Sequence, residues 1–160
     1  MKTRLFLPAV LFTLLQPALL QCQQLTVENG SGKQTQLTRA DLEALPHVKV
    51  TTGSAGASAT FEGVALGALL AKAGVGFGET LRGKRMASCL LVEAADGYRA
   101  VIALPELDPA FTDKQIVLAF LKDGKPLDDK EGPYRIVIPD EKRMARWVRQ
   151  VTVLKIVDVQ

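Results

Sequence analysis

The pattern of apolar and polar positions predicts a chain built mainly of short strands joined by tight turns. Residues 25–28 and 33–37 flank Asn29-Gly30, a dipeptide that supplies the positive φ angles of a hairpin turn. The other predicted strands are short runs rich in apolar residues, at 47–52, 59–61, 87–94, 98–103, 116–121, 134–138 and 151–159. Because hairpins outnumber strand–helix–strand units, the predicted fold class is α+β, with mixed or antiparallel sheets and a few short helices.

Two segments have the spacing of short helices instead. Thr38 and Asp41 form a capping pair whose side chains can accept from free backbone N–H groups, and the helix that they begin ends at Pro46. Over residues 66–73, one helical face collects the larger apolar side chains, Leu66, Leu69, Leu70 and Ala73. Gly74 follows, and glycine readily adopts the left-handed conformation that ends a helix. This second helix is expected to cover one face of a sheet.

The first 22 residues have the layout of a secretory signal peptide. Lys2 and Arg4 precede an apolar run over residues 5–15, which is followed by a more polar stretch. We therefore expect residues 1–22 to be removed and residues 23–160 to form a single domain. The mature protein is expected in the periplasm or outside the cell, with no later segment apolar enough to span a membrane.

Two other interpretations of this leader stay open. As a membrane anchor, the run is short and is interrupted at Pro8, Gln16 and Pro17. As a lipoprotein signal, it would leave Cys22 retained and acylated, but Gln21 is larger than the small residue that such a signal needs before its cysteine. Cleavage of a signal peptide therefore remains the expectation.

Charge and cysteine content narrow the class of partner. Removing Lys2 and Arg4 from the 20 cations leaves 18 against 17 acids, so the mature chain has a formal charge of only +1. A nucleic-acid-binding domain needs a marked excess of cations, so no nucleic-acid partner is expected. With Cys22 removed, Cys89 is the one remaining cysteine, so no intramolecular disulfide can form and the core must supply the stability.

Several short segments occur in the order and spacing of a known family. They are Leu45-Pro46, the predicted strand over 48–52, Phe61-Glu62-Gly63-Val64, Leu69-Leu70, Asp96-Gly97-Tyr98 and residues 142–147. Together these segments, which lie between Thr38 and Val157, resemble the oxidoreductase molybdopterin-binding domain, the fold of sulfite-oxidase-type enzymes. The resemblance implies a molybdopterin cofactor, with a Lys or Arg beside a Trp in residues 142–147 cradling the pterin phosphate.

The same resemblance places a molybdenum-ligating cysteine between Thr51 and Ser58. This sequence has only Thr, Gly, Ser and Ala there, and residues 53–58 are predicted to form a flexible connection. Because molybdenum on a pterin dithiolene is a soft centre, a neutral hydroxyl is a much weaker ligand than a thiolate. No metal of the usual kind is therefore expected. Cys89 could substitute, but its apolar strand predicts a buried small residue.

A cluster of cations surrounds the single tryptophan. Arg143, Arg146 and Arg149 recur every three residues, so a helical turn would place them on one face, where they could hold phosphate or carboxylate. Lys142 adds a fourth cation. The alternative is a solvated basic face, partly neutralised by neighbouring acids. Trp147 could stack on a planar ligand, or it could close the edge of the core.

Three more residues have both a ligand-binding and a structural interpretation. His47, the only histidine, could face a pocket or form a local hydrogen bond. Asp96 and Tyr98 could line a pocket, while Asp96-Gly97 also fits the corner of a hairpin. With the cationic segment, these residues make up the predicted cofactor-binding set: His47, Asp96, Tyr98, Lys142, Arg143, Arg146 and Trp147.

Three classes of function follow from these features. The first is an exported binding protein that keeps an anion-accepting pocket without molybdenum–thiolate chemistry, recognising an anionic small molecule or an exported partner protein. The second is a genuine molybdopterin-dependent oxidoreductase with an atypical metal ligand. The third is an interaction domain without a ligand. The missing thiolate argues against redox catalysis, and no motif for serine catalysis or nucleotide binding is present.

Overall fold

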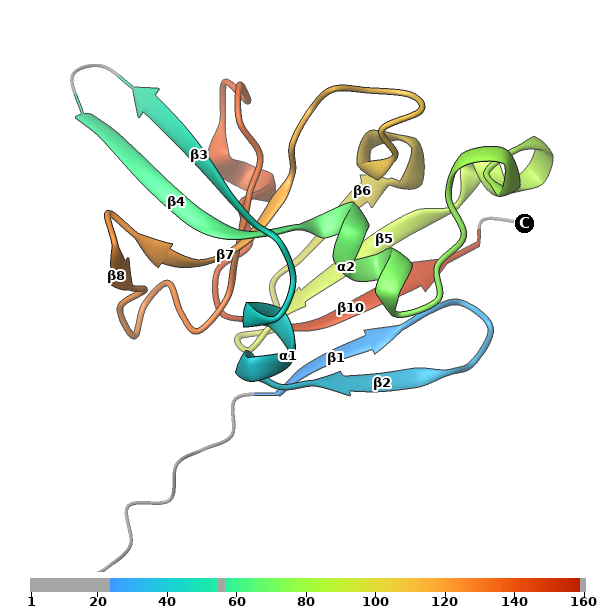
Figure 1. Ribbon diagram of the computed structural model, residues 1–160, viewed down its shortest axis with the longest axis horizontal. Helices are drawn as coiled ribbons and strands as arrows, with labels where there is room; N and C mark the ends of the chain where they lie inside the picture. Colours follow the sequence, from blue (N-terminus) through green and yellow to red (C-terminus); the bar gives the residue numbers. More distant parts are fainter. Residues whose placement is uncertain (1–23, 55–56, 159–160) are drawn as a thin grey trace, which may run out of the picture.

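A computed structural model describes residues 24–54 and 57–158, which form two five-stranded sheets and several short helices (Figure 1). Sheet A has the order β2-β1-β10-β5-β6, with β1 Leu25–Glu28, β2 Gln34–Leu37, β5 Cys89–Ala94, β6 Arg99–Ala103 and β10 Val151–Val157. Sheet B has the order β3-β4-β7-β8, with β9 also on β7; its strands are β3 His47–Ser54, β4 Ala57–Ala65, β7 Val117–Lys122, β8 Lys125–Pro126 and β9 Arg135–Val137. The helices are α1 Arg39–Glu43, α2 Leu66–Lys72 and the 3₁₀ helices η1 Gly78–Thr80, η2 Gly83–Ala87, η3 Leu104–Leu107 and η4 Met144–Arg146.

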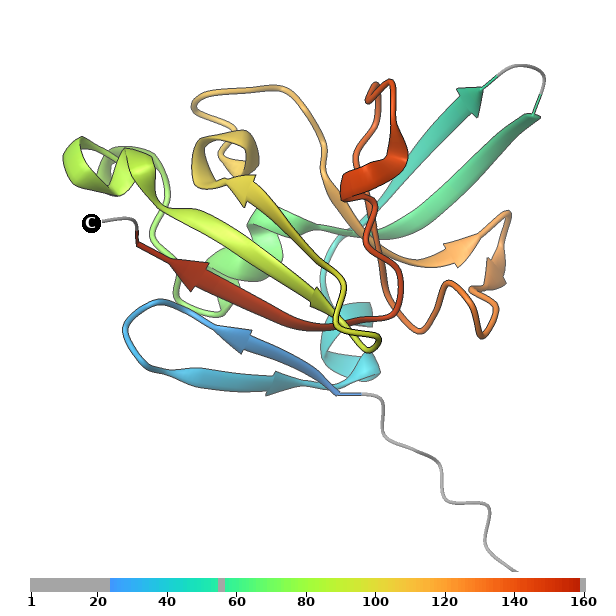
Figure 2. The ribbon, with the colours of Figure 1, turned by 180° about the vertical axis from the view of Figure 1, so that it is seen from behind.

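The strand pairing confirms the α+β class with mixed or antiparallel sheets. In sheet A, β1 and β10 pair in parallel, and every other strand pair of the described residues is antiparallel. Strand β10, the last along the chain, therefore lies in the middle of sheet A between β1 and β5 (Figure 2). The first and the last strand along the chain, β1 and β10, therefore lie side by side in sheet A.

The local signals at the start of the chain work as predicted. Strands β1 and β2 form the hairpin, and Gly30 in its turn has a φ of +81°. The backbone N–H of Thr38 donates to Asp41 at 2.8 Å, and the Asp41 N–H donates back to the Thr38 hydroxyl at 3.3 Å. Helix α1 ends before Pro46, as expected from a proline that cannot continue it.

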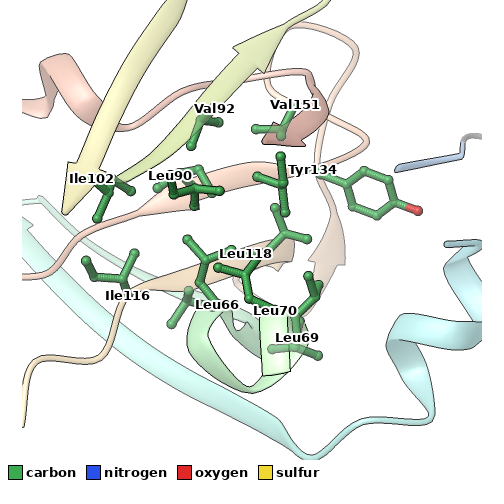
Figure 3. Packing of buried hydrophobic residues seen from close by; sticks show 14 of the residues in the cluster. Leu66, Leu69, Leu70, Leu90, Val92, Ile102, Ile116, Leu118, Tyr134 and Val151 are labelled. Atoms are coloured by element: carbon green, nitrogen blue, oxygen red, sulfur yellow. The ribbon is translucent and has the colours of Figure 1, made fainter. Parts of the chain in front are cut away.

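Helix α2 packs its predicted apolar face into the core between the two sheets. Leu66, Leu69 and Leu70 are fully buried, and Gly74 follows with a φ of +91°. Figure 3 shows these leucines pointing toward labelled side chains from both sheets, Leu90, Val92 and Ile102 of sheet A and Leu118 of sheet B. The helix thus joins the two sheets through one shared core.

The predicted flexible connection at residues 53–58 was wrong for most of its length. Strands β3 and β4 continue as a hairpin to Ser54 and from Ala57, with Gly53 opposite Ser58, while residues 55–56 lie outside the described part. The predicted strand at 59–61 is accordingly longer. Backbone pairing with a neighbouring strand outweighs the weak strand propensity of small residues here. The hairpin extends away from the rest of the fold (Figure 1).

Several predicted strands are one or two residues shorter in the structure. Residues 83–87 form η2, so β5 starts at Cys89, and β10 ends at Val157. Within the described residues, no helix has both the length and the apolar character needed to cross a membrane.

Candidate functional site

A cavity of about 330 Å³ lies where the β5–β6 turn meets the segment around η4; we call it the Tyr98 cavity. Its lining residues are Ala94, Asp96, Tyr98, Lys130, Met144, Ala145, Trp147, Val148, Arg149 and Gln150. Three of the seven residues predicted to bind a cofactor therefore meet at one hollow, although they are up to 51 positions apart in the chain. The two segments that the resemblance singled out, Asp96-Gly97-Tyr98 and residues 142–147, both contribute to it.

The side chain of Tyr98 holds the β5–β6 turn to η4. The Asp96 carboxylate accepts the Tyr98 N–H at 2.9 Å, and Gly97 has a φ of +86°, so the predicted turn geometry is confirmed. The Tyr98 hydroxyl then donates to the carbonyl oxygen of Ala145 at 2.7 Å. Tyr98 thereby serves the turn and forms one wall of the cavity, with half of its surface exposed.

Trp147 closes the edge of the core, which confirms the structural interpretation of its position. It is 5% exposed and makes an edge-to-face contact with Phe61 of β4 at 6.1 Å between ring centroids. This contact brings the η4 segment beside the β3–β4 hairpin. Its indole N–H is buried and has no acceptor among the described residues. Such a donor costs about 1–3 kcal/mol until an acceptor reaches it.

Arg135, which the sequence analysis did not single out, is the buried cation of this region. Its guanidinium group lies 5.2 Å from the ring centroid of Phe61 and 5.5 Å from that of Trp147. One terminal nitrogen donates to Glu131 at 2.6 Å, while Nε has no acceptor within the described chain. The signal available in the sequence was a charged residue inside the apolar run at 134–138.

Glu131 is shared between two cations. Lys122 lies with its Nζ 3.4 Å from both carboxylate oxygens of Glu131 and 5.7 Å from the centroid of the Phe61 ring. One carboxylate therefore faces Lys122 and Arg135, which leaves a local charge of +1 beside Trp147. The charged residues of the cavity lining are Lys130, Arg149 and Asp96, so the lining itself has a net charge of +1.

Comparison with known proteins identifies the family. The sequence profile described as the oxidoreductase molybdopterin binding domain matches residues 17–159. The chain belongs to this family. The segments that carried the resemblance in the sequence are thus those of a molybdopterin-binding domain, and its fold class is the one expected.

A solved structure has the same fold. The sulfane dehydrogenase SoxCD from Paracoccus pantotrophus superposes with a TM-score of 0.66 at 23% sequence identity. The match covers 85% of this chain but 38% of that one, so this chain spans well under half of its length. No curated protein matches the chain in sequence. The likeness therefore establishes the molybdopterin-binding-domain fold.

Within this molybdopterin-binding domain, the cations near η4 are not arranged as predicted. The expected helical face was wrong: η4 is a single 3₁₀ turn, and Trp147 and Val148 after it are buried. Arg149 lines the Tyr98 cavity, while Lys142 and Arg143 lie exposed outside its lining. In a continuous helix, the adjacent residues Trp147 and Val148 would point in different directions, whereas here both are buried.

Arg146 is occupied by carboxylates. Its guanidinium group donates to Glu106 at 3.1 and 3.3 Å and to Glu141 at 2.9 Å, and the Nη2–Glu141 contact is shorter still. It also reaches the Val101 carbonyl oxygen at 3.4 Å. An incoming anion would have to displace two carboxylates to reach this residue. Arg146 ties η4 to η3 and β6.

The Arg146–Glu106 pair predicts a pH-dependent stability. Burial raises the pKa of Glu106, but hydrogen bonds from Arg146 and from the Ala103 N–H outweigh it and hold the pKa below its usual range. A lowered folded-state pKa stabilises the protein above the unfolded value, and this stabilisation disappears as pH falls through the folded value. The stability difference between wild type and Glu106→Gln, measured by urea unfolding, should therefore shrink from neutral pH to about pH 3. A constant difference would contradict the pairing.

His47 forms the local interactions that its structural interpretation predicted. Its Nδ1 lies 3.1 Å from a carboxylate oxygen of Glu62, and its ring packs edge-on against Phe120 at 5.2 Å between centroids. It stands on β3 and is not part of the Tyr98 cavity lining. The structure thus separates His47 from the other predicted binding residues.

The donors available for a metal are sparse. Within residues 24–54 and 57–158, no group of three or more His, Cys, Asp or Glu side chains is placed to hold a metal ion. Cys89 lies on β5 of sheet A, opposite Ala103 and Val157, and is partly rather than fully buried. The hairpin over Thr51 and Ser58 belongs to the other sheet, sheet B.

Proposed function

We propose that this chain is an exported member of the molybdopterin-binding-domain family that binds an anionic small ligand in the Tyr98 cavity without molybdenum–thiolate chemistry. The observation that carries the proposal is the donor-rich, net positive surrounding of the cavity. Lys130 and Arg149 line it, and Arg135 lies behind Trp147 with its charge only partly balanced by Glu131. A cavity of about 330 Å³ is within the usual range for small-molecule sites.

Two buried donors support a ligand that carries acceptor oxygens. The Nε1 of Trp147 and the Nε of Arg135 are buried, have no acceptor in the described chain, and belong to side chains that contact each other. Most buried donors in folded proteins are satisfied, so two unsatisfied donors in one cluster favour an acceptor supplied from outside the chain. Phosphate and carboxylate groups offer such acceptors together with the negative charge that the cations favour.

The donor set does not fit a metal held in the usual way by this family. Where the resemblance places a thiolate, the sequence offers the hydroxyls of Thr51, Thr52 and Ser54. Hydroxyls are hard and neutral, whereas molybdenum on a dithiolene prefers a soft anionic ligand. The cations of the Tyr98 cavity suit the anionic part of a molybdopterin or of another small anion equally well. Binding, rather than redox chemistry, is therefore the function proposed.

Export rests on the sequence alone. Lys2 and Arg4 before the apolar run at 5–15 are the features of a cleaved leader. Edman sequencing or intact mass of the protein recovered from a periplasmic fraction tests this part directly. A mature chain that starts near residue 23 is the expected result, and an uncleaved chain retained in the cytoplasm would overturn it.

Native mass spectrometry with elemental analysis tests the ligand. The protein, exported by a host that makes molybdopterin, should carry an anionic small-molecule mass without molybdenum, and Arg149→Gln should lose most of it. Arg99→Gln is the matched control, because Arg99 is largely exposed, pairs with Glu93 and does not line the cavity. Stoichiometric molybdenum would overturn the proposal in favour of the oxidoreductase. If the protein has a ligand-free mass and also shows no saturable phosphate binding by calorimetry, the third class, an interaction domain without a ligand, would be favoured instead.

Trp147→Phe gives a sharper test of the same cavity. The substitution keeps the ring against Phe61 and removes only the unpaired N–H, so stability should stay within about 1 kcal/mol of wild type or rise. Ligand or phosphate affinity should fall about tenfold, since a hydrogen bond to an anion is lost. Unchanged affinity with raised stability would show that the indole N–H has no part in binding.

A further inference from the structure

A second cavity, of about 310 Å³, lies on the other side of Gln150; we call it the Arg39 cavity. Gln150 is the one residue that lines both this cavity and the Tyr98 cavity. Its side chain donates to the Asp129 carbonyl oxygen at 2.7 Å, and its backbone bonds to Ala95 and Glu131 at 3.0 Å each. Gln150 is therefore fixed on three sides, so the two hollows are separate sites.

Arg39 presents an oriented guanidinium group at this cavity. The group stacks on the Phe120 ring, 4.0 Å from its centroid, and its Nε donates to Glu43 at 2.7 Å. Its two terminal nitrogens have no acceptor among the described residues. Stacking and the Nε bond hold the plane of the group, which leaves one edge of the fork for a carboxylate.

Two carboxylates line the same cavity. Asp128 accepts the N–H groups of Lys130 and Glu131 through one oxygen, at 2.9 and 3.0 Å, which orients its carboxylate. Neither the second oxygen of Asp128 nor the carboxylate of Asp129 has a donor within the described chain. The lining thus carries one cation and two acids, with a net charge of −1.

Most of the remaining lining is apolar. Phe120 is 1% exposed and forms the floor beneath Arg39, and Leu127 packs against the core beside it. Two prolines and a glycine complete this side. A side chain of a few carbon atoms placed here would be removed from water against a surface that loses little entropy.

From this arrangement we infer that the Arg39 cavity binds a small zwitterion with an apolar side chain, namely a free amino acid or the paired termini of a short peptide. Its carboxylate pairs with Arg39, its ammonium group with Asp128 and Asp129, and its side chain lies on Leu127 and the two prolines beside it. A simple anion meets the carboxylates of Asp128 and Asp129, and a simple cation meets Arg39, so only a ligand with both charges satisfies the lining. This site does not depend on a ligand in the Tyr98 cavity.

The test is titration of the purified protein with L-leucine by ligand-detected NMR or calorimetry, beside two analogues. L-Leucinamide lacks the carboxylate and N-acetyl-L-leucine lacks the ammonium group, so each should bind at least about tenfold more weakly than leucine. Arg39→Gln should weaken leucine by a similar factor and abolish the preference for leucine over leucinamide. Asp129→Asn should likewise reduce the preference for leucine over N-acetyl-leucine.

Matched variants keep the result interpretable. Arg99→Gln removes an exposed arginine that lines neither cavity, and Arg149→Gln removes one from the Tyr98 cavity; both should bind leucine as wild type does. Circular dichroism melting of Arg39→Gln checks that its fold is intact. Tighter binding of leucinamide than of leucine would replace the zwitterion with a cation site. Equal binding of all three compounds, wild-type affinity in Arg39→Gln, or no saturable binding at millimolar concentration would overturn the inference.

Discussion

Replacing Gly63 by alanine is expected to destabilise the protein by about 3 kcal/mol or more. Gly63 lies on β4 at a break in the register with β7, where the two backbones approach closely. A Cβ there would lie 2.6 Å from Ala119 Cα and 2.7 Å from the Leu118 carbonyl carbon, and closer still to the Leu118 oxygen. These atoms are backbone in the middle of sheet B and cannot turn aside. Urea unfolding of Gly63→Ala measures the loss.

Gly53→Ala on the same hairpin is the control for this prediction. The nearest atom to a Cβ at Gly53 is the Ser58 Cβ at 3.9 Å, an ordinary contact, so its stability should stay within about 1 kcal/mol of wild type. Equal losses in the two variants would mean that strand propensity, rather than the β4–β7 approach, governs both. Phe61 is two residues from Gly63 and contacts Trp147, so a shift of β4 should also weaken ligand binding at the Tyr98 cavity.

The parts of the fold that the sequence predicts are those decided by neighbours in the chain. The Asn29-Gly30 turn and the Thr38–Asp41 capping pair each depend on a few adjacent residues. Helix α2 follows from a spacing of apolar positions that any sheet would bury. Residues 53–58 were predicted wrongly because their own propensities favour a loop. Strand pairing between β3 and β4, which is not local in the sequence, holds most of them extended.

The candidate site depends on contacts that the sequence does not contain. Phe61, Arg135 and Trp147 meet only because β4 and β9 both pair with β7 and the chain returns across them. The three-residue spacing of the arginines favoured a helix, yet the burial of Trp147 and Val148 ends that helix after one turn. Of the three arginines, only Arg149 lines the Tyr98 cavity of the described chain.

The ion pair of Arg146 is another contact that could not be predicted from the sequence. Its partner Glu106 lies 40 positions earlier, on η3, and no local pattern relates the two residues. A cation that looked available for a phosphate is already neutralised within the fold. By contrast, Asp96 and Tyr98 were recognised from a turn motif, and the same turn carries them to the cavity.

Removing the carboxylate of Glu131 is expected to cost about 3 kcal/mol, because it leaves a buried cation without its partner. The side chains of Arg135 and Glu131 are only 5% and 14% exposed, and they are 2.6 Å apart. Arg135→Met, which removes the buried charge and keeps an apolar chain of similar length, should cost less than Glu131→Ala. Lys122 would still face Glu131 in that variant. Urea unfolding of the two single variants and the double variant completes a double-mutant cycle.

The cycle decides whether Glu131 and Arg135 act as a pair. The double variant Glu131→Ala/Arg135→Met should be more stable than Glu131→Ala alone, since it removes the uncompensated charge; additive losses would contradict this.

The same charge argument extends to the Tyr98 cavity. With Glu131 removed, the positive charge of Arg135 beside Trp147 is no longer balanced, so phosphate should bind Glu131→Ala more tightly than wild type and restore part of the lost stability. If phosphate affinity instead stays the same in Glu131→Ala and in Arg135→Met, the charge of Arg135 does not reach the cavity.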